Sequence, residues 1–252
     1  MRRFKPKRSS SRVQTHKVVG VFGRDAGAEH IEDKSEAKGP MLQLDHITII
    51  APSLAEGVAH VRVCLDIDVP FGRLHRDMGT YNHLLRLGES VYLEIIAVNP
   101  GAPRPTRPRW FGLDDQNAVR AAWDSGFRLR GWVARTTDID SVLSKREGLL
   151  GNKTRLSGGD SFFFFSIPAD GSLPLGGVAP SVIDRRGRPP SVASMADLGA
   201  ELRAMIIEHP NPDDVADLYG KLGVDVPPEV QRGVYFRYRA MIQTPGGLRE
   251  LS

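Results

Sequence analysis

Two side chains able to do chemistry lie within apolar, strand-like segments of the sequence. His46 interrupts the apolar run 42–50, and Glu94 interrupts the apolar run 92–97. A carboxylate in so apolar a strand is costly to bury unless it is paired or bound to a metal. An imidazole nitrogen and a carboxylate oxygen together suit Zn, Mn, Fe or Ni, and such an ion would polarise adjacent substrate oxygens. His46 and Glu94 are therefore candidate catalytic residues and metal ligands, and a structural ion pair is the alternative.

A strand-to-helix junction recurs three times along the chain. Each copy has an apolar run, a residue able to cap a helix, and an acidic residue three positions later; the pairs are Ser53 with Glu56, Thr137 with Asp140, and Asn211 with Asp214. The capping residue can satisfy a free backbone N–H group, and the acidic residue can interact with the positive end of the helix dipole. The separations of 84 and 74 residues favour internal duplication. Unrelated capped helices in an α/β protein are the alternative.

Apolar runs, turn residues and prolines predict the elements that follow residue 41. They are strand 41–50, helix 53–65, strands 69–75, 79–87 and 90–98, an extended linker 101–109, strand 128–135, helix 137–147, strands near 162–165 and 178–183, a loop 185–190, strand 201–208, helix 211–222, and strands 234–243 and 247–251. The closely spaced prolines of the linker disfavour both helix and sheet.

The positive charge of the chain is concentrated at its start. The chain has 34 Lys and Arg and 30 Asp and Glu residues. Residues 1–40 hold ten of the basic and five of the acidic residues, which leaves 24 and 25 for residues 41–252. We interpret residues 1–40 as a disordered basic tail or as a mis-assigned start upstream of Met41. Because the basic excess lies in this segment, a nucleic-acid partner is not expected.

Several classes of protein are excluded or disfavoured. No run of eighteen apolar residues is present, so a membrane span is not expected. Cys64 is the only cysteine, which rules out an intramolecular disulfide and agrees with the cytoplasmic location that we expect. The sequence has no phosphate loop, dinucleotide-binding glycine motif, His-Glu-x-x-His motif or nucleophile elbow. A serine or cysteine hydrolase is therefore unsupported.

Four segments resemble a known family. Leu44-Asp45-His46, Gly79-Thr80-Tyr81-Asn82, Tyr92 to Ala97, and Pro108 to Leu113 are similar to segments of the glyoxalase-like domain proteins of the vicinal oxygen chelate superfamily. The resemblance extends over roughly residues 41–245 and implies an α+β fold. In this fold, repeated βαβββ modules form curled mixed sheets that enclose a small-molecule cleft.

The resemblance and the repeated spacing together predict how the domain 41–252 is divided. We expect a first βαβββ module at 41–100, a linker at 101–126, a second module at 127–188, and a partial third βαββ unit at 198–252. A homodimer is left open.

The resemblance also implies roles for single residues. In superfamily enzymes the corresponding first-strand His and fourth-strand Glu hold a divalent metal, which implies this role for His46 and Glu94. His75 and Asn82, on either side of a predicted turn, would bind the substrate or stabilise the turn. Trp110 would form a wall of the cleft or anchor the linker in the core.

The second module departs from the metal-binding pattern. Counting seven residues back from each expected helix cap gives His46, Arg130 and Ala204, so the histidine is not repeated. Asp184 is the only acidic candidate in the last strand of the second module, where it could equally end the strand. Arg130 could instead bind an anionic substrate group, because its planar guanidinium fits carboxylate or phosphate.

Two functions from different classes follow. The first is an enzyme that acts on a small oxygenated or anionic metabolite by lyase or isomerase chemistry, with or without a divalent metal, and a dioxygenase-like reaction is also open. The second is a metal-free protein of the same fold that binds or sequesters a small molecule.

Overall fold

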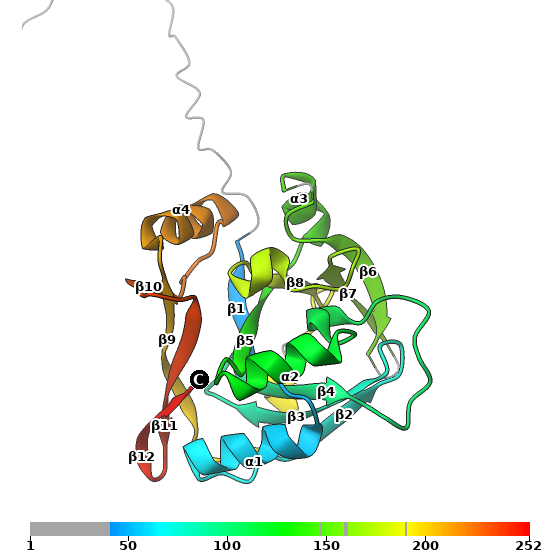
Figure 1. Cartoon of the computed structure of the whole chain (residues 1–252). Coiled ribbons are helices and arrows are strands. Elements are labelled where there is room, and N and C mark those ends of the chain that lie inside the picture. The colour runs from blue at the N-terminus through cyan, green and yellow to red at the C-terminus, as the bar shows by residue number, and fades with distance from the viewer. Residues whose placement is uncertain (1–40, 147, 159–160, 190) are drawn as a thin grey trace, which may run out of the picture. The chain divides into compact units, whose positions relative to one another are not determined.

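The computed structural model describes residues 41–252 except 147, 159–160 and 190. Both interpretations of residues 1–40 therefore concern residues outside the described ones. The described elements form two β-sheets with helices packed against them (Figure 1), which confirms the predicted α+β class. Among the described residues, no helix is both long and apolar enough to cross a membrane.

The first half of the large sheet contains four strands and one helix. They are β1 (Gln43–Ile50), α1 (Leu54–Leu65), β2 (Phe71–His75), β3 (Thr80–Arg86) and β4 (Tyr92–Val98). β4 lies parallel to β1 and antiparallel to β3, and β2 forms the edge. The hydroxyl of Ser53 accepts a hydrogen bond from the backbone N–H of Glu56 at 3.3 Å, so the predicted cap of α1 is present.

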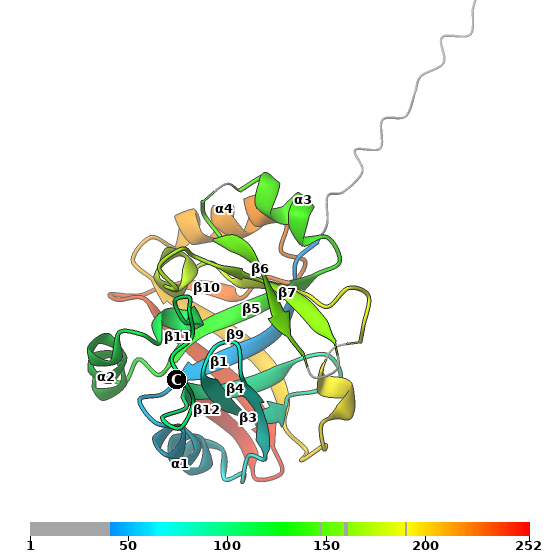
Figure 2. The same ribbon diagram turned by 90° about the vertical axis from the view of Figure 1, so that its right-hand side faces the viewer.

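The second half repeats this arrangement. Its elements are β5 (Leu129–Thr136), α3 (Ile139–Ser144), β6 (Asn152–Ser157), β7 (Phe162–Ile167) and β8 (Ser181–Asp184). β8 is parallel to β5, as β4 is to β1, and β1 and β5 join the halves as an antiparallel pair. The order of the sheet is β2-β3-β4-β1-β5-β8-β7-β6, and Figure 2 shows β1 and β5 in its middle. The predicted repeat of βαβββ modules is confirmed.

The last part of the chain forms a separate four-stranded sheet. Its elements are β9 (Glu201–His209), α4 (Pro212–Leu222), β10 (Glu229–Arg232), β11 (Arg237–Thr244) and β12 (Gly247–Leu251). The order β10-β9-β11-β12 places the strand after the helix directly beside the first strand, unlike in the two modules. The third unit therefore repeats the strand-to-helix junction but not the strand order.

One α-helix and two strands were not predicted, and one predicted cap is wrong. The additional elements are α2 (Gln116–Asp124), which lies inside the expected linker, and β6 and β10. α3 is capped by Asp138, whose carboxylate accepts the backbone N–H of Ser141 at 3.0 Å, and not by Thr137. Asn211 precedes α4 as expected but makes no capping hydrogen bond through its side chain.

The large sheet is apolar on both faces. One face packs into a core that includes Ile47, Ile49 and Trp132, with Tyr219 and Tyr238 from the last unit. The opposite face forms a second cluster that includes Ile50, Ile96, Val133, Trp110 and Phe165. Because strand side chains alternate between faces, the even-numbered residues of β4, and those of β1 from His46 onward, point to the second cluster. His46 and Glu94 have this parity.

Candidate functional site

A cavity of about 450 Å³ lies on the concave face of the large sheet. Its polar lining residues are His46, Arg73, His75, Asn82, Tyr92, Glu94, Arg185, Arg188, Ser191 and Ser194. Its larger apolar lining residues are Leu84, Trp110, Phe111, Phe163, Phe165 and Ile183. Pockets of about 300–1,000 Å³ that combine an apolar wall with a few polar groups are typical small-molecule sites.

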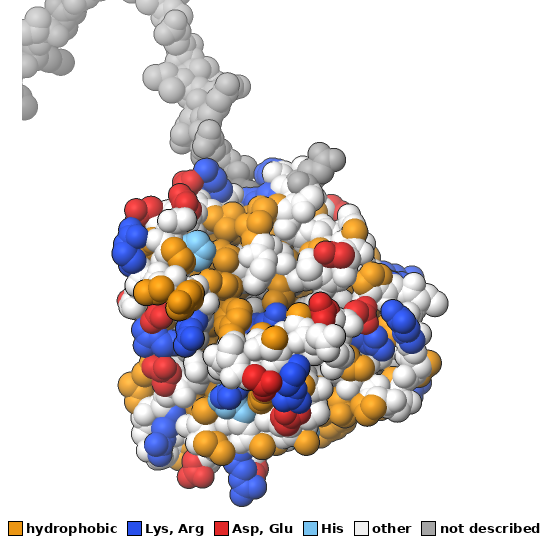
Figure 3. All heavy atoms as spheres, viewed as in Figure 1, with side chains coloured by type: hydrophobic (Ala, Val, Ile, Leu, Met, Phe, Trp, Pro, Cys, Tyr) orange, Lys and Arg blue, Asp and Glu red, His pale blue; other side chains and the backbone are white. Residues whose placement is uncertain are grey.

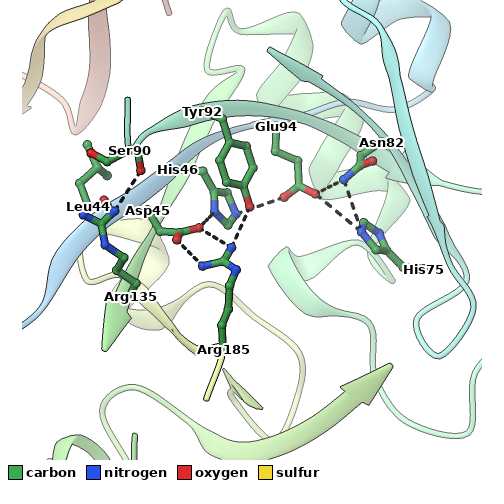
Figure 4. Close-up of polar contacts among 10 residues, drawn as sticks. All are labelled: Leu44, Asp45, His46, His75, Asn82, Ser90, Tyr92, Glu94, Arg135 and Arg185. Atoms are coloured by element: carbon green, nitrogen blue, oxygen red, sulfur yellow. Dashed lines mark hydrogen bonds and ion pairs between the residues drawn. The ribbon is translucent and has the colours of Figure 1, made fainter. Parts of the chain in front are cut away.

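A row of three buried polar side chains forms the floor of the cavity (Figure 4). Nδ1 of His46 lies 2.6 Å from Oδ1 of Asp45, and Nε2 of His46 lies 3.4 Å from Oε2 of Glu94. The exposed fractions of the three residues are 0%, 3% and 5%. The imidazole ring is therefore held between two carboxylates, with only its Glu94 side near the cavity.

A β-bulge in β1 brings Asp45 and His46 together. In the pairing with β5, Leu44 is opposite Ala134 and His46 is opposite Val133, so Asp45 is an extra residue without a partner. Neighbouring side chains of a regular strand point to opposite faces, whereas a bulge lets two in succession point the same way. The bulge thus explains how Asp45 reaches the ring of the next residue.

Arg185 completes the far end of the row. Its Nη1 donates to Oδ2 of Asp45, and its Nη2 donates to Oδ1 of Asp45 at 2.8 Å, so the pair is bidentate. Nη2 also lies 3.3 Å from the hydroxyl of Tyr92, whose ring stacks on His46 with centroids 4.5 Å apart. Arg185 and Tyr92 therefore restrict the position and the orientation of the His46–Asp45 pair.

His46 and Glu94 each stabilise the charged form of the other. Burial alone would lower the pKa of His46, but hydrogen bonds to Asp45 and Glu94 raise it above its ordinary value. Burial alone would raise the pKa of Glu94, but the hydrogen bond to His46 lowers it below its ordinary value. These opposite shifts favour an imidazolium–carboxylate pair over two neutral groups.

Asn82 and His75 surround the other oxygen of Glu94. The amide of Asn82 donates to Oε1 of Glu94 at 2.6 Å, and Nε2 of His75 lies 4.0 Å from the same oxygen. Nδ1 of His75 is 3.0 Å from the hydroxyl of Thr80. The structure thus places His46, Glu94, His75 and Asn82 around one point of the cavity.

His75 provides a prediction for acid stability. Burial lowers its pKa from 6.5 to about 4. Between these values the unfolded chain binds a proton that the folded chain lacks, so the free energy of unfolding falls as the pH decreases through this window. We expect a shallower fall in a His75→Gln variant, measured by urea unfolding at about pH 7 and about pH 4.5. If the free energy of unfolding falls equally between these two pH values in both proteins, the result would contradict the lowered pKa of His75.

Trp110 and Phe111 form one wall of the cavity. Trp110 makes edge contacts with His75 and Phe165 at centroid distances of 5.0 and 5.2 Å. Both residues belong to the short 3-10 turn Trp110–Gly112, in which Phe111 adopts φ 60°. The same turn anchors the linker in the core. Trp110 therefore has both expected roles, as a wall of the cleft and as a core anchor.

Arg130 and Asp184 lie outside the cavity lining. The guanidinium of Arg130 lies over the ring of Phe127 at 5.8 Å, and its Nε and Nη1 are buried without a hydrogen-bond partner in the described structure. Asp184 accepts the backbone N–H groups of Ile139 and Arg186, so it stabilises a turn and the start of α3. Counting seven residues back from the observed cap at Asp138 gives Gly131, which is why Arg130 does not correspond to His46.

The donors in the cavity fall short of a family-type metal site. Only His46, His75 and Glu94 among the described lining residues are of a metal-binding type, and all come from the first module. Nε2 of His75 is 3.4 Å from the amide nitrogen of Asn82, so it already has a partner. Within the described part of the chain, no three His, Cys, Asp or Glu residues are arranged to hold a metal ion. The residues present do not fit the three or more protein ligands of a typical catalytic metal site.

The sequence analysis missed Asp45, which holds His46 in place, and the arginines of the cavity, Arg73, Arg185 and Arg188. Asp45 precedes His46, but regular alternation would place it on the other face of the strand. Arg185 and Arg188 belong to the loop expected at 185–190, and nothing in that short basic segment shows that it folds over the first strand. One signal in the sequence could have pointed to Arg185, because a basic residue there directly follows the last strand of a module.

Comparisons with known proteins agree with the geometry. The family model of the glyoxalase-like domain matches residues 44–223, which is more than half of the chain. No curated protein is a significant match. A hypothetical protein from Staphylococcus aureus is 13% identical, with 81% of this chain and 91% of that chain covered and a TM-score of 0.53, and it shares the fold.

Methylmalonyl-CoA epimerase structures overlap less well. The Streptomyces coelicolor enzyme in complex with 2-nitronate-propionyl-CoA is 19% identical, with 57% of this chain and 97% of that chain covered and a TM-score of 0.36. A structure with methylmalonyl-CoA and NH4+ is 19% identical, with 59% and 98% covered and a TM-score of 0.37. Overlaps of this size carry no argument about the substrate. From the family match, the chain belongs to the glyoxalase-like domain family.

Proposed function

We propose that the chain is an enzyme that transfers a proton at a carbon atom next to a carbonyl group of a small, anionic metabolite, in an isomerase- or lyase-type reaction. The observation that carries this proposal is the buried Asp45–His46–Glu94 row that meets a cavity of about 450 Å³. Titratable groups whose pKa values are shifted in opposite directions within a cavity are typical of acid–base sites.

Each group of the row has a role in this reaction. Oε2 of Glu94 accepts the proton of the C–H bond, and Nε2 of His46 donates its proton to the carbonyl oxygen, which leaves a neutral enol. When the deprotonated carbon carries a hydroxyl group, return of the proton from Glu94 to the former carbonyl carbon, with loss of the hydroxyl proton to His46, completes an isomerisation. Expulsion of a leaving group from the next carbon, with return of the enol proton to His46, completes an elimination. Asn82 orients Glu94 through its 2.6 Å hydrogen bond, and Asp45 orients His46.

Proton exchange in deuterated water tests this function directly. We expect the protein to exchange the C–H protons next to the carbonyl in at least one member of a panel of small 2-oxo acids, detected by proton NMR. A Glu94→Gln variant should exchange them at least about 100-fold more slowly, because it cannot accept the proton. No exchange by a folded protein that binds a panel member, or unchanged exchange by Glu94→Gln, would contradict the proposal.

A metal-assisted version of the reaction is tested separately. Nε2 of His46 and Oε2 of Glu94 face each other at 3.4 Å, with Asp45 behind the imidazole as in many metal sites. With two facing donors we expect the protein to retain well under one equivalent of Zn, Mn, Fe or Ni after reconstitution and dialysis. One equivalent that is lost in the His46→Ala/Glu94→Ala variant would contradict this expectation and support a metal-assisted enzyme.

A binding protein of the same fold is the second candidate. Its support is the same cavity together with the incomplete ligand set. Saturable binding of a ligand that undergoes no exchange or turnover would favour this function over the enzyme.

The remaining expectations about partners stay predictions. On the face shown in Figure 3, Lys and Arg side chains are interspersed with Asp and Glu side chains, so this face presents no continuous basic patch to a nucleic acid. The open question of a homodimer is answered by sedimentation of the purified chain, and the expected cytoplasmic location by microscopy of a tagged protein.

A further inference from the structure

Two arginines of the cavity lack a carboxylate partner among the described residues. Arg73 makes no side-chain hydrogen bond or ion pair there, and Arg188 donates only to neutral oxygens, those of Arg185, Ser161 and Phe162. Arg185, by contrast, is already paired with Asp45. Both guanidinium groups line the cavity, and within the described part of the chain no carboxylate balances their positive charge.

Arg73 lies close to the proton-transfer groups. It is opposite Asn82 in the pairing of β2 with β3, and its backbone N–H donates to the side-chain oxygen of Asn82 at 2.8 Å. Asn82 in turn holds Glu94. Arg73 is also two positions from His75 on the same strand, so both side chains share the face that lines the cavity. An anionic group held by Arg73 would therefore lie beside the carbon atom that Glu94 deprotonates.

The wall of the cavity is built from aromatic rings. Phe111 and Phe165 lie edge to face at 5.9 Å, and Trp110 contacts both of them. Phe163 also lines the cavity and is only partly buried. A ring is the ligand group that such a wall accommodates best, because aromatic pairs prefer edge and offset contacts.

We propose that the substrate is an aromatic carboxylic acid, whose carboxylate binds between Arg73 and Arg188 and whose ring packs against Trp110, Phe163 and Phe165. This inference rests on the proposed function and names its class of substrate. A planar guanidinium binds a carboxylate through two parallel hydrogen bonds, which aligns the acid with respect to Glu94.

Calorimetric titration with three related probes tests this inference. Phenylpyruvate carries the ring and the carboxylate, benzyl methyl ketone lacks the carboxylate, and pyruvate lacks the ring. We expect phenylpyruvate to bind at least about ten-fold more tightly than either truncated probe. Equal binding of the neutral ketone or of pyruvate, or no saturable binding of phenylpyruvate at about 10 mM, would overturn the inference. Tighter binding of phenyl phosphate would overturn the assignment of a carboxylate.

Variants of the arginines locate the binding site. Arg73→Gln and Arg188→Gln should each weaken phenylpyruvate about ten-fold or more and leave benzyl methyl ketone unaffected. Arg237→Gln, on the exposed side of the second sheet, is the matched control and should change neither. Arg73 is exposed and its side chain has no partner among the described residues, so its replacement is not expected to disturb folding. Unchanged affinity in Arg73→Gln and Arg188→Gln would contradict the assigned site.

The outcomes separate this inference from the proposed function. If phenylpyruvate binds through these arginines but no 2-oxo acid undergoes proton exchange, the proposed function fails and the binding class stands. If exchange occurs equally well with acids that lack a ring, the class of substrate fails and the function stands.

Discussion

Replacement of Asp45 by Ala is expected to lower the free energy of unfolding by roughly 3–5 kcal/mol. Asp45 is 0% exposed and accepts both hydrogen bonds of the bidentate pair with Arg185, as well as the contact with Nδ1 of His46. Its removal leaves the buried imidazole of His46 and the partly buried guanidinium of Arg185 without their carboxylate partner. Urea unfolding at neutral pH, followed by circular dichroism, measures the loss.

Two further variants show whether a buried charge left without its partner causes the loss of stability in Asp45→Ala. An Asp45→Ala/Arg185→Leu variant removes both charges and should be less destabilised than Asp45→Ala alone. Asp217→Ala breaks the exposed ion pair with Lys221 and should leave the unfolding midpoint nearly unchanged. A loss of under about 1 kcal/mol in Asp45→Ala would show that the bidentate pair does not form.

Local signals in the sequence were sufficient for most of the fold. The strand 42–50 and the helix after Ser53 were found because an apolar run ends at a capping residue, and the same signal located β5 and β9. Elements without such a signal were missed. β6 has only Leu156 buried, because it is a polar edge strand, and α2 buries only Val119 and Trp123. With so few buried positions, the hydrophobic residues of these elements show no recognisable periodic spacing in the sequence.

The site was less predictable than the fold because part of it depends on contacts between distant residues. His46 and Glu94 could be chosen from the sequence, since polar residues in apolar strands require a partner. The contribution of Asp45 depends on a one-residue bulge, and that of Arg185 depends on a contact across 140 positions. Arg130 was chosen because the helix cap was placed one residue too early.

Replacement of Gly171 by Ala is the second change with a large expected effect. Gly171 has φ +77°, and a Cβ atom there would lie 2.1 Å from the backbone oxygen of Arg109. Its own carbonyl accepts the backbone N–H of Gly112 at 2.8 Å. A left-handed conformation costs about 1–2 kcal/mol for a residue with a Cβ atom, and a forced backbone shift costs about 1–3 kcal/mol more. We therefore expect a loss of roughly 2–5 kcal/mol in urea unfolding.

The matched control is Gly112→Ala, in the same hydrogen-bonded pair. Gly112 has φ +68°, but a Cβ atom there would meet nothing within 4 Å, so only the cost of the left-handed conformation remains, about 1–2 kcal/mol. Because Arg109 directly precedes Trp110, its displacement in Gly171→Ala should also move the aromatic wall. We expect this variant to weaken phenylpyruvate, while Gly112→Ala binds it nearly as well as the wild type. Equal stability and equal binding in the two variants would show that Gly171 does not hold the wall in place.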